Sequence, residues 1–145
     1  MDIEHVRSRF IKHFDGTTGF IYASPGRINL IGEHTDYNGG HVFPCAITMG
    51  TYALVRKRTD NRFRFCSLNY PDQGVLELPV WELDWKREHG WANYPKGMIC
   101  TLMKKGVPVA CGMDLLYYGD IPKGLGIGSS ASLEVVTGLI IRDLM

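Results

Sequence analysis

Residues 119–134 read GDIPKGLGIGSSASLE, a glycine-rich turn that a strand enters and a helix leaves. The segment 113–118 before it, apolar except for Asp114, indicates the strand. After it, apolar residues recur at helical spacing through residues 129–145, which indicates a long helix. The chain therefore contains a strand-to-helix connection whose turn is built largely from glycine, and that turn is the first candidate for a functional site.

The turn has the composition of a phosphate-binding loop. Gly124, Gly126 and Gly128 precede Ser129 and Ser130 at the start of the predicted helix. Such a loop can direct several backbone N–H groups at one point, where the helix N-terminus adds partial positive charge. Glycine lets phosphate oxygens approach the backbone and permits positive φ. Ser129 or Ser130 can cap the helix, and a hydroxyl there can also ligate Mg²⁺ held by a nucleotide.

Other glycine-rich motifs fit this turn less well. The P-loop pattern GxxxxGK[ST] is absent, since no lysine follows the last glycine. A dinucleotide-binding fingerprint would need glycine where Ser129 stands and an acidic residue at the end of a second strand, whereas Asp143 lies inside the predicted helix. A plain strand-to-helix turn with a serine cap stays open from this loop alone.

A second stretch, GRINLIGEHTDYNGG at residues 26–40, ends an apolar strand in ionisable side chains. Gly32 frees the backbone to turn. Glu33 and Asp36 can then accept hydrogen bonds from sugar hydroxyls, and His34 can donate or accept. Arg27 supplies a permanent charge. Convergent short acceptors of this kind are typical of polyol recognition.

Several alternatives remain for the second stretch. Glu33 and Asp36 lie three residues apart in one loop, whereas a glycosidase pair faces its partner across the scissile bond. His34 and Asp36 could ligate a metal, but no third ligand is evident and His41 is only loosely placed. Arg27 could form a structural ion pair or neutralise a transferring phosphoryl group. Taken alone, the loop could also be a solvated turn.

The rest of the chain predicts alternating helices and strands. We expect helices at 3–14 and 91–105, strands at 20–23, 28–31 and 75–78, and a hairpin of strands 51–58 and 62–68 around residues 59–61. The trio Arg56, Lys57 and Arg58 would mark the solvated end of its strand. The apolar face of the last helix continues to Met145 without a capping signal, so we expect the chain to be part of a longer protein.

Composition excludes several classes. The 145 residues suffice for one domain, 1–145, with its own core. The formal net charge of +1 and the lack of a long basic run imply neither a nucleic-acid partner nor an acidic membrane surface. Four widely spaced cysteines have no metal-ligand spacing, and neither a signal peptide nor a membrane-spanning run is present. These features predict a soluble, cytoplasmic protein.

Together the two motifs resemble a known family. SPGRINLIGEHTDYNGG, residues 24–40, resembles the signature of galactokinases, and GDIPKGLGIGSSASLEV, residues 119–135, resembles the phosphate-binding motif of the wider GHMP kinase superfamily, which includes homoserine and mevalonate kinases. The resemblance runs over essentially the whole chain. It implies an α/β (α+β) GHMP kinase N-terminal domain, in which a mixed sheet carries helices on one side, similar to the second domain of a small-subunit ribosomal protein.

The resemblance also implies an activity: ATP-dependent phosphorylation of the anomeric hydroxyl of galactose, giving galactose 1-phosphate in the Leloir pathway, with Mg²⁺. It implies that Arg27 is catalytic and that the galactose-binding residues are Glu33, His34, Thr35 and Asp36. The ATP-binding residues would be Gly124, Leu125, Gly126, Ile127, Gly128, Ser129 and Ser130, with Ser130 also coordinating magnesium. Trp91 and Tyr94 resemble positions near the adenine, although core packing explains them equally well.

Departures from the family pattern qualify this interpretation. Leu125 stands where small residues are usual, and Gly128 replaces a frequent serine. The family's catalytic aspartate and much of its C-terminal domain lie beyond Met145, so we expect that domain to be the packing partner and residues 1–145 alone to be inactive. Two other functions remain open: a galactokinase-like regulator that binds sugar and ATP without catalysis, and a kinase of a related sugar.

Overall fold

The structure is a computed structural model that describes residues 2–17, 19–32, 34–122 and 128–145. The helices and strands run in the order α1 (Ile3–Phe14), β1 (Phe20–Asn29), β2 (Pro44–Lys57), β3 (Arg62–Ser67), β4 (Val75–Pro79), α2 (Asn93–Lys104), β5 (Met113–Gly119) and α3 (Ser129–Leu144). Short 3-10 turns lie between them: η1 (Asp36–Asn38), η2 (Pro71–Gln73) and η3 (Arg87–Ala92).

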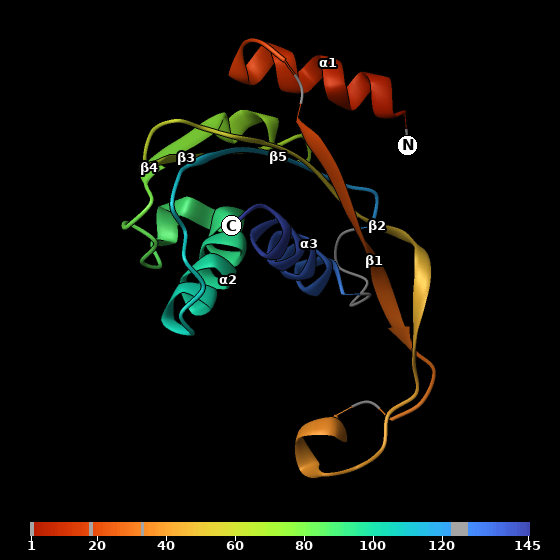
Figure 1. Cartoon of the computed structure of the whole chain (residues 1–145). Coiled ribbons are helices and arrows are strands. Elements are labelled where there is room, and N and C mark those ends of the chain that lie inside the picture. Colours follow the sequence, from red (N-terminus) through yellow and green to blue (C-terminus); the bar gives the residue numbers. More distant parts are fainter. Residues whose placement is uncertain (1, 18, 33, 123–127) are drawn as a thin grey trace.

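The strands form one mixed sheet with the order β1-β2-β5-β3-β4. Strands β3 and β5 pair in parallel, and the other neighbours pair antiparallel. Helices α2 and α3 pack side by side on one face (Figure 1). This architecture confirms the predicted α/β class and mixed sheet, and it adds one feature: α1 lies across the opposite face.

Side-chain alternation along the strands explains how both faces are covered. Ala53 and Val55 of β2 point into the main core under α2 and α3, whereas Leu54 between them packs against α1. Helix α1 contributes Val6, Phe10 and Phe14, all buried. Its apolar spacing was visible in the sequence, and the predicted bounds 3–14 are confirmed. The Asp2 carboxylate caps this helix by accepting from the backbone N–H groups of residues 4 and 5.

The predicted hairpin of residues 51–58 and 62–68 is wrong. Both strands exist, but β5 lies between them and pairs with each. Asp114 of β5 is fully buried, with a relative exposure of 0%, and it faces Arg56 of β2 and Arg64 of β3. A buried carboxylate requires charged partners. The two arginines meet that need because β5 lies between their strands.

Three guanidinium groups surround the Asp114 carboxylate. Arg56 donates to Oδ2 at 2.6 Å, while Arg64 and Arg58 donate to Oδ1 at 2.6 and 3.0 Å. Arg56 also donates to the carbonyl groups of Phe14, Asp15 and Thr17, so the same network anchors the end of α1. Arg56 and Arg58 therefore do more than mark a solvated strand end.

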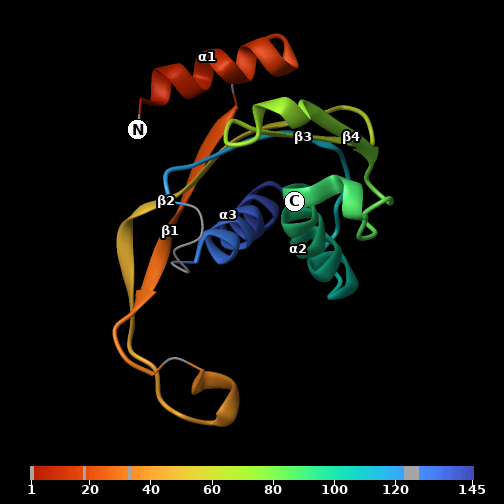
Figure 2. The same cartoon turned by 180° about the vertical axis from the view of Figure 1, so that it is seen from behind.

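Strand β1 is continuous, where the sequence indicated two strands at 20–23 and 28–31. Its pairing with β2 shifts register between Pro25 and Arg27 and then continues to Asn29. Backbone hydrogen bonds from Leu30 N to Phe43 O and from Phe43 N to Ile31 O extend the pair. The C-terminal part of β1, the N-terminal part of β2 and the residues between them form an arm. This arm leaves the body of the domain and carries η1 at its tip (Figure 2).

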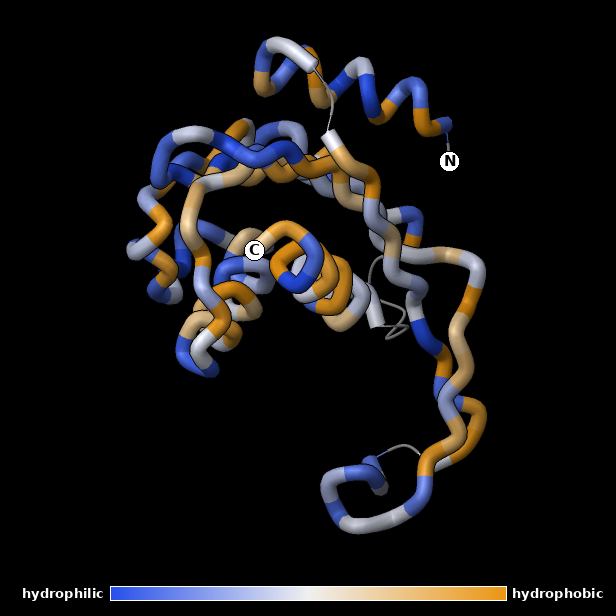
Figure 3. Tube along the Cα trace, in the orientation of Figure 1, coloured by the Kyte–Doolittle hydropathy of each residue, from blue (hydrophilic) through white to orange (hydrophobic). Residues whose placement is uncertain are grey.

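The arm exposes an unusual amount of apolar surface. Leu30 and Ile31 have relative exposures of 59% and 69%, and Phe43 on the returning chain has 62%. Figure 3 shows apolar residues along both extended segments of the arm. Contiguous exposed apolar surface of this kind is typical of an interaction site.

We expect replacement of Asp114 by Asn to lower the free energy of unfolding by about 3 kcal/mol, because three guanidinium groups lose their shared anion. Urea unfolding followed by circular dichroism measures this loss. The control Glu77→Gln removes the exposed Arg62–Glu77 ion pair, which should contribute less than about 1 kcal/mol. Equal losses in the two variants would contradict a central role for Asp114.

The same variant should alter the response to acid. Burial raises the pKa of Asp114, but hydrogen bonds from Arg64, Arg56 and Arg58 outweigh it and lower the pKa below its ordinary value. The carboxylate therefore contributes its full stability above the unfolded-state pKa of about 3.9, and that stability is lost as pH falls through the lowered folded-state pKa. The stability difference between wild type and Asp114→Asn should shrink over that acidic range, and a difference that stays constant would overturn this assignment.

Candidate functional site

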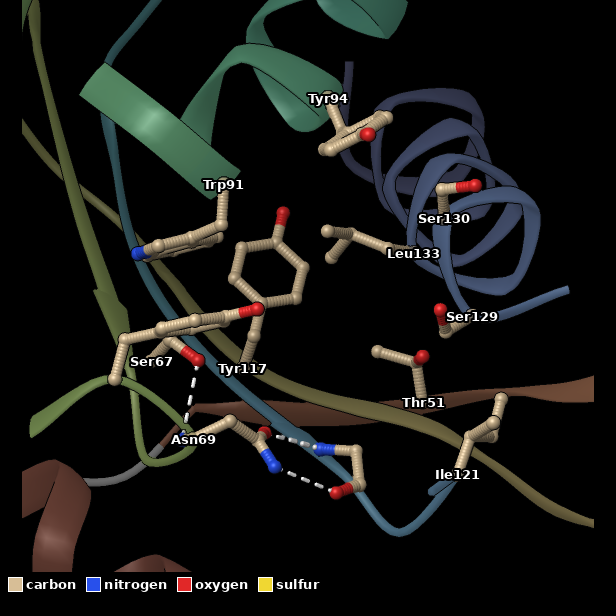
Figure 4. A pocket seen from close by; sticks show the side chains of 12 residues that line it. Thr51, Ser67, Asn69, Trp91, Tyr94, Tyr117, Ile121, Ser129, Ser130 and Leu133 are labelled. Atoms are coloured by element: carbon tan, nitrogen blue, oxygen red, sulfur yellow. Dashed lines mark hydrogen bonds between the residues drawn. The ribbon is translucent and has the colours of Figure 1, made fainter. Parts of the chain in front are cut away.

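Two hollows contain most of the predicted site residues that the structure describes, and the first of them adjoins the N-terminus of α3. The first has a volume of about 250 Å³ and lies between β2, β5, the segment after β3 and the helices (Figure 4). Its lining residues are Thr51, Ser67, Asn69, Tyr70, Trp91, Tyr94, Tyr117, Gly119, Ile121, Ser129, Ser130 and Leu133. The second has a volume of about 430 Å³ and lies along the arm. Its lining residues are Arg27, Asn29, Gly32, His34, Asp36, Tyr37, Val42 and Pro44.

Aromatic rings form one side of the first hollow. The rings of Tyr70 and Trp91 are parallel within 4°, with centroids 6.4 Å apart. Trp91 also meets the Tyr117 ring edge-on at 5.7 Å and is only 9% exposed, so it belongs to the core and lines the hollow at once. Tyr94 is half exposed at the rim. Flat aromatic surfaces at a partly open hollow suit a planar ligand ring.

Tyr117 at the back of the first hollow is neutral at ordinary pH. Burial raises the pKa of Tyr117 well above its ordinary value. Its hydroxyl lies 3.0 Å from the Thr137 hydroxyl, which in turn donates to the carbonyl of Leu133. The back wall is therefore uncharged and rigidly bonded to α3.

A buried lysine holds the segment that carries Trp91. Lys96 of α2 is fully buried, and its Nζ donates to the Asp84 carbonyl at 2.5 Å and lies 2.6 Å from His89 Nδ1. Burial lowers the pKa of Lys96, and burial together with the neighbouring Lys96 lowers the pKa of His89. The 3-10 turn η3 is thus fastened to α2 immediately before Trp91.

The N-terminus of α3 opens onto the first hollow. Gly128 is the N-cap, with a left-handed φ of 76°, and the helix begins at Ser129. The prediction that Ser129 or Ser130 caps the helix is therefore wrong, because both residues already lie within the first turn. Both serines are exposed and line the hollow. The predicted residues Gly124, Leu125, Gly126 and Ile127 lie outside the described part of the chain.

The second hollow gathers most of the polar residues predicted in the arm. His34 has a positive φ of 59°, and its Nδ1 lies 2.5 Å from the Tyr37 hydroxyl. Asp36 opens η1 and lines the same hollow. Arg27 lines it from β1. Glu33 lies outside the described residues.

Thr35 holds the turn closed. Its hydroxyl lies 2.6 Å from the Gly32 carbonyl and 2.9 Å from the His41 carbonyl, and its own carbonyl accepts from Gly40 N at 2.7 Å. It is not among the described lining residues of the hollow. Its predicted contact with a ligand stays a prediction, while its bonds to the turn give it a structural task.

Several lining residues were missed at the sequence level. Asn29 stands two positions after Arg27 on the same strand, so strand alternation could have placed both on one face. Tyr37 lies inside the quoted motif and could have been included with it. Asn69 had no local signal, since its side chain pairs with both backbone groups of Gly119, at 2.7 and 2.8 Å, across fifty residues of sequence (Figure 4).

Arg27 lies between the second hollow and the start of α3. It lines this hollow, and its backbone also lies against Gly128 at the start of α3. A Cβ atom added to Gly128 would come within 3.5 Å of Arg27 N and 3.7 Å of Arg27 O. Both candidate motifs thus meet at one strand. Among the described residues, no group of three or more His, Cys, Asp or Glu side chains is placed to hold a metal ion.

Two family descriptions match the chain. "Galactokinase galactose-binding signature" matches residues 8–57, and "GHMP kinases N terminal domain" matches residues 93–145. The galactokinase of Clostridium beijerinckii is 50% identical over 143 residues, covering 99% of this chain and 37% of the relative. That of Exiguobacterium sibiricum is 53% identical over 135 residues, covering 93% of this chain and 35% of the relative.

Solved structures show the same similarity. Lactococcus lactis galactokinase complexed with galactose superimposes with a TM-score of 0.94 at 44% identity, covering 99% of this chain and 37% of that one. Methanococcus jannaschii mevalonate kinase has a TM-score of 0.72 at 20% identity, covering 86% of this chain and 40% of that one, and shares the fold. The chain thus spans little more than a third of these relatives. Within its described residues, no helix is both long and apolar enough to cross a membrane.

We expect Gly128→Ala to lower the free energy of unfolding by about 1–2 kcal/mol, because alanine is strained at a left-handed φ. The control Gly97→Ala lies on α2, where an added Cβ meets nothing within 4 Å, and it should stabilise the chain by about 0.5–1 kcal/mol. Thermal unfolding of both variants measures the difference. A Gly128→Ala variant that unfolds at the wild-type temperature or above it would show that the N-cap conformation carries no strain.

Proposed function

Because the chain corresponds in sequence and fold to the N-terminal region of galactokinases, members of the GHMP kinase superfamily, we propose that the full-length protein transfers the γ-phosphoryl group of ATP to the anomeric hydroxyl of galactose, with Mg²⁺. The chain spans about 37% of its relatives' length, so this activity belongs to the whole protein. The observation that carries the proposal is the position of Arg27 between a polar hollow and the N-terminus of α3.

The second hollow is the proposed sugar site. Asp36 would accept hydrogen bonds from sugar hydroxyls, together with Glu33. His34, whose Nδ1 is paired with the Tyr37 hydroxyl, would present its other ring nitrogen to the sugar. The Thr35 bonds to the turn would keep these groups converging. Several fixed polar partners give selectivity, because an analogue that lacks one hydroxyl leaves a site group unpaired.

The first hollow is the proposed nucleotide site. Trp91 and Tyr94 would contact the adenine ring, which fits the flat aromatic side of the hollow. The phosphates would lie at the N-terminus of α3, where backbone N–H groups and the helix dipole favour anions. Residues 124–130 would form the phosphate loop, and the Ser130 hydroxyl would be one ligand of Mg²⁺. The bound ATP and Mg²⁺ would supply the transferable phosphoryl group and neutralise part of its charge.

Arg27 would act on the transferring group. Phosphoryl transfer needs chiefly positioning and charge stabilisation. A guanidinium between the second hollow and the start of α3 can provide both without changing its protonation state. The catalytic aspartate and the second magnesium carboxylate would come from the remainder of the full-length protein. Its C-terminal domain would then pack against this one and complete the site, in the cytoplasm.

Two other functions predict different ligand behaviour. A regulator would bind galactose and ATP without forming product. A kinase of a related sugar would show a larger thermal shift with that sugar than with galactose. A thermal-shift screen of the full-length protein with sugars, with and without nucleotide, followed by product detection, separates these from a galactokinase.

In the full-length protein, Arg27→Lys should lower kcat for galactose phosphorylation by about 10²–10³, because lysine cannot reproduce the planar, bidentate charge at the phosphoryl group. A coupled assay of ADP formation measures the change. The matched control Arg62→Lys alters an arginine of the β3–β4 edge that pairs with Glu77, and it should leave kcat unchanged. Unchanged turnover in Arg27→Lys would refute the proposed role.

Residues 1–145 alone should have no significant kinase activity, since the proposed catalytic carboxylate is supplied by the rest of the protein. The measurement is galactose 1-phosphate formation by the purified domain at saturating ATP, Mg²⁺ and galactose. Turnover at rates ordinary for a kinase would contradict this division of the site.

A further inference from the structure

The regular pairing of β1 with β2 is interrupted at one point of the arm. Ser24 and Pro25 of β1 stand opposite Thr51 and Gly50 of β2, and regular pairing resumes only at Arg27. Pro25 has no N–H, so it cannot donate to the carbonyl of Gly50. Buried backbone N–H and C=O groups need hydrogen-bond partners, because leaving one unpaired costs free energy. Ser24 and Thr51 are both buried.

Ser132 bonds to backbone groups of both strands at this point. Its hydroxyl donates to the Ser24 carbonyl at 2.7 Å and accepts from Thr51 N at 3.0 Å. Ser132 lies in the first turn of α3 and is only 2% exposed. One hydroxyl therefore joins three elements. These are helix α3, strand β1, which leads to Arg27, and strand β2 at Thr51, which lines the first hollow.

Asp120 forms hydrogen bonds with the backbone of Gly50, the residue before Thr51 on β2. Its Oδ1 accepts from Gly50 N at 2.7 Å, and its own N–H donates to Gly50 O at 3.1 Å. Asp120 directly follows β5, whose last residue Gly119 is held on the other side by the amide of Asn69. The two side chains, Asp120 and Ser132, thus bond to consecutive residues of β2, Gly50 and Thr51.

We propose that Asp120 and Ser132 are positioning residues that fix the N-terminus of α3 relative to Arg27, an inference that rests on the proposed kinase function. Asp120 comes before Gly124 in the sequence and Ser132 comes after Gly128, and both side chains bond to the strand pair that carries Arg27. Neither side chain is required to touch a ligand. Each acts through the placement of the helix terminus and of the strand beside it.

Loss of this placement would change the position of Arg27 relative to the N-terminus of α3. The register shift lies directly before Arg27, and Gly128 packs on the Arg27 backbone. If Ser132 lost its hydroxyl, Ser24 O and Thr51 N would both be left without this partner, and the strand could move away from the helix. Rates of group transfer are sensitive to displacements of about 1 Å, which can change them by about 10². Sugar contacts at the arm tip would be affected far less.

The test uses the full-length protein with Ser132→Ala, Asp120→Ala and Asp120→Asn. We expect both alanine variants to lower kcat at least tenfold, with KM for galactose within twofold of wild type. Asp120→Asn should recover most of the lost rate, because an amide oxygen can still accept from Gly50 N. The control Ile140→Val trims a fully buried residue of the same helix, away from the register shift, and should lower the melting temperature while kcat stays within twofold.

Two kinetic results would overturn the proposal. If Asp120→Asn is as slow as Asp120→Ala, the carboxylate acts through its charge rather than by positioning. If Ser132→Ala behaves like Ile140→Val, its hydroxyl serves stability alone.

Amide hydrogen exchange separates this inference from the proposed function. Gly50 and Thr51 should lose protection in the corresponding alanine variants and regain it in Asp120→Asn, whether or not the protein phosphorylates galactose. An inactive wild type would defeat the kinase proposal. Unchanged exchange at Gly50 and Thr51 would defeat the positioning proposal.

Discussion

The buried Asp114 carboxylate is the constraint on which the rest of the domain depends. It has no access to solvent and is neutralised by Arg56, Arg58 and Arg64, which come from β2, the residue after it, and β3. Strand β5 lies between β2 and β3, so that Asp114 faces arginines of both, and β3 pairs with β5 in parallel. Because Arg56 also binds the carbonyl groups at the end of α1, the network sets the position of that helix as well.

The candidate site lies where regular sheet pairing ends. Strand β2 belongs to the body at its C-terminal half, which pairs with β5, and to the arm at its N-terminal half, which pairs only with β1 among the described strands. Gly50 and Thr51 mark the change. At that point the side chains of Asp120 and Ser132 bond to the backbone of β2, and Ser132 also bonds to β1, which holds α3 against the strand that carries Arg27. The same irregularity that interrupts the sheet therefore joins the proposed sugar and nucleotide sites.

Local sequence signals predicted the elements well and their neighbours poorly. The periodicity of residues 3–14 was sufficient to place α1, and the strand–glycine–helix pattern placed β5 and α3. The predicted hairpin is wrong because a short turn at residues 59–61 does not fix which strand lies beside β2, and the long-range ion pairs of Asp114 with Arg56 and Arg64 form with β5 between the two strands. The sequence predicted two strands in place of β1 because proline usually indicates a break in a strand. In the structure a register shift between Pro25 and Arg27 accommodates the proline. The serine cap failed because Gly128 already occupies the capping position.

The sequence by itself determined which chemistry is present: a polar cluster on a turn after Arg27, a glycine-rich segment before two serines, and the family resemblance that joins them. These features are local, since each depends on residues within one turn or strand. Only the tertiary structure decided which groups meet. Ser132 bonds to Ser24 across 108 positions and to Thr51 across 81, and Asp114 bonds to Arg56 across 58. Burial determines these partners, because a buried polar group must bond to a donor or acceptor that the packed sheet places within hydrogen-bond distance. The periodicity of the sequence does not indicate which distant residue that will be.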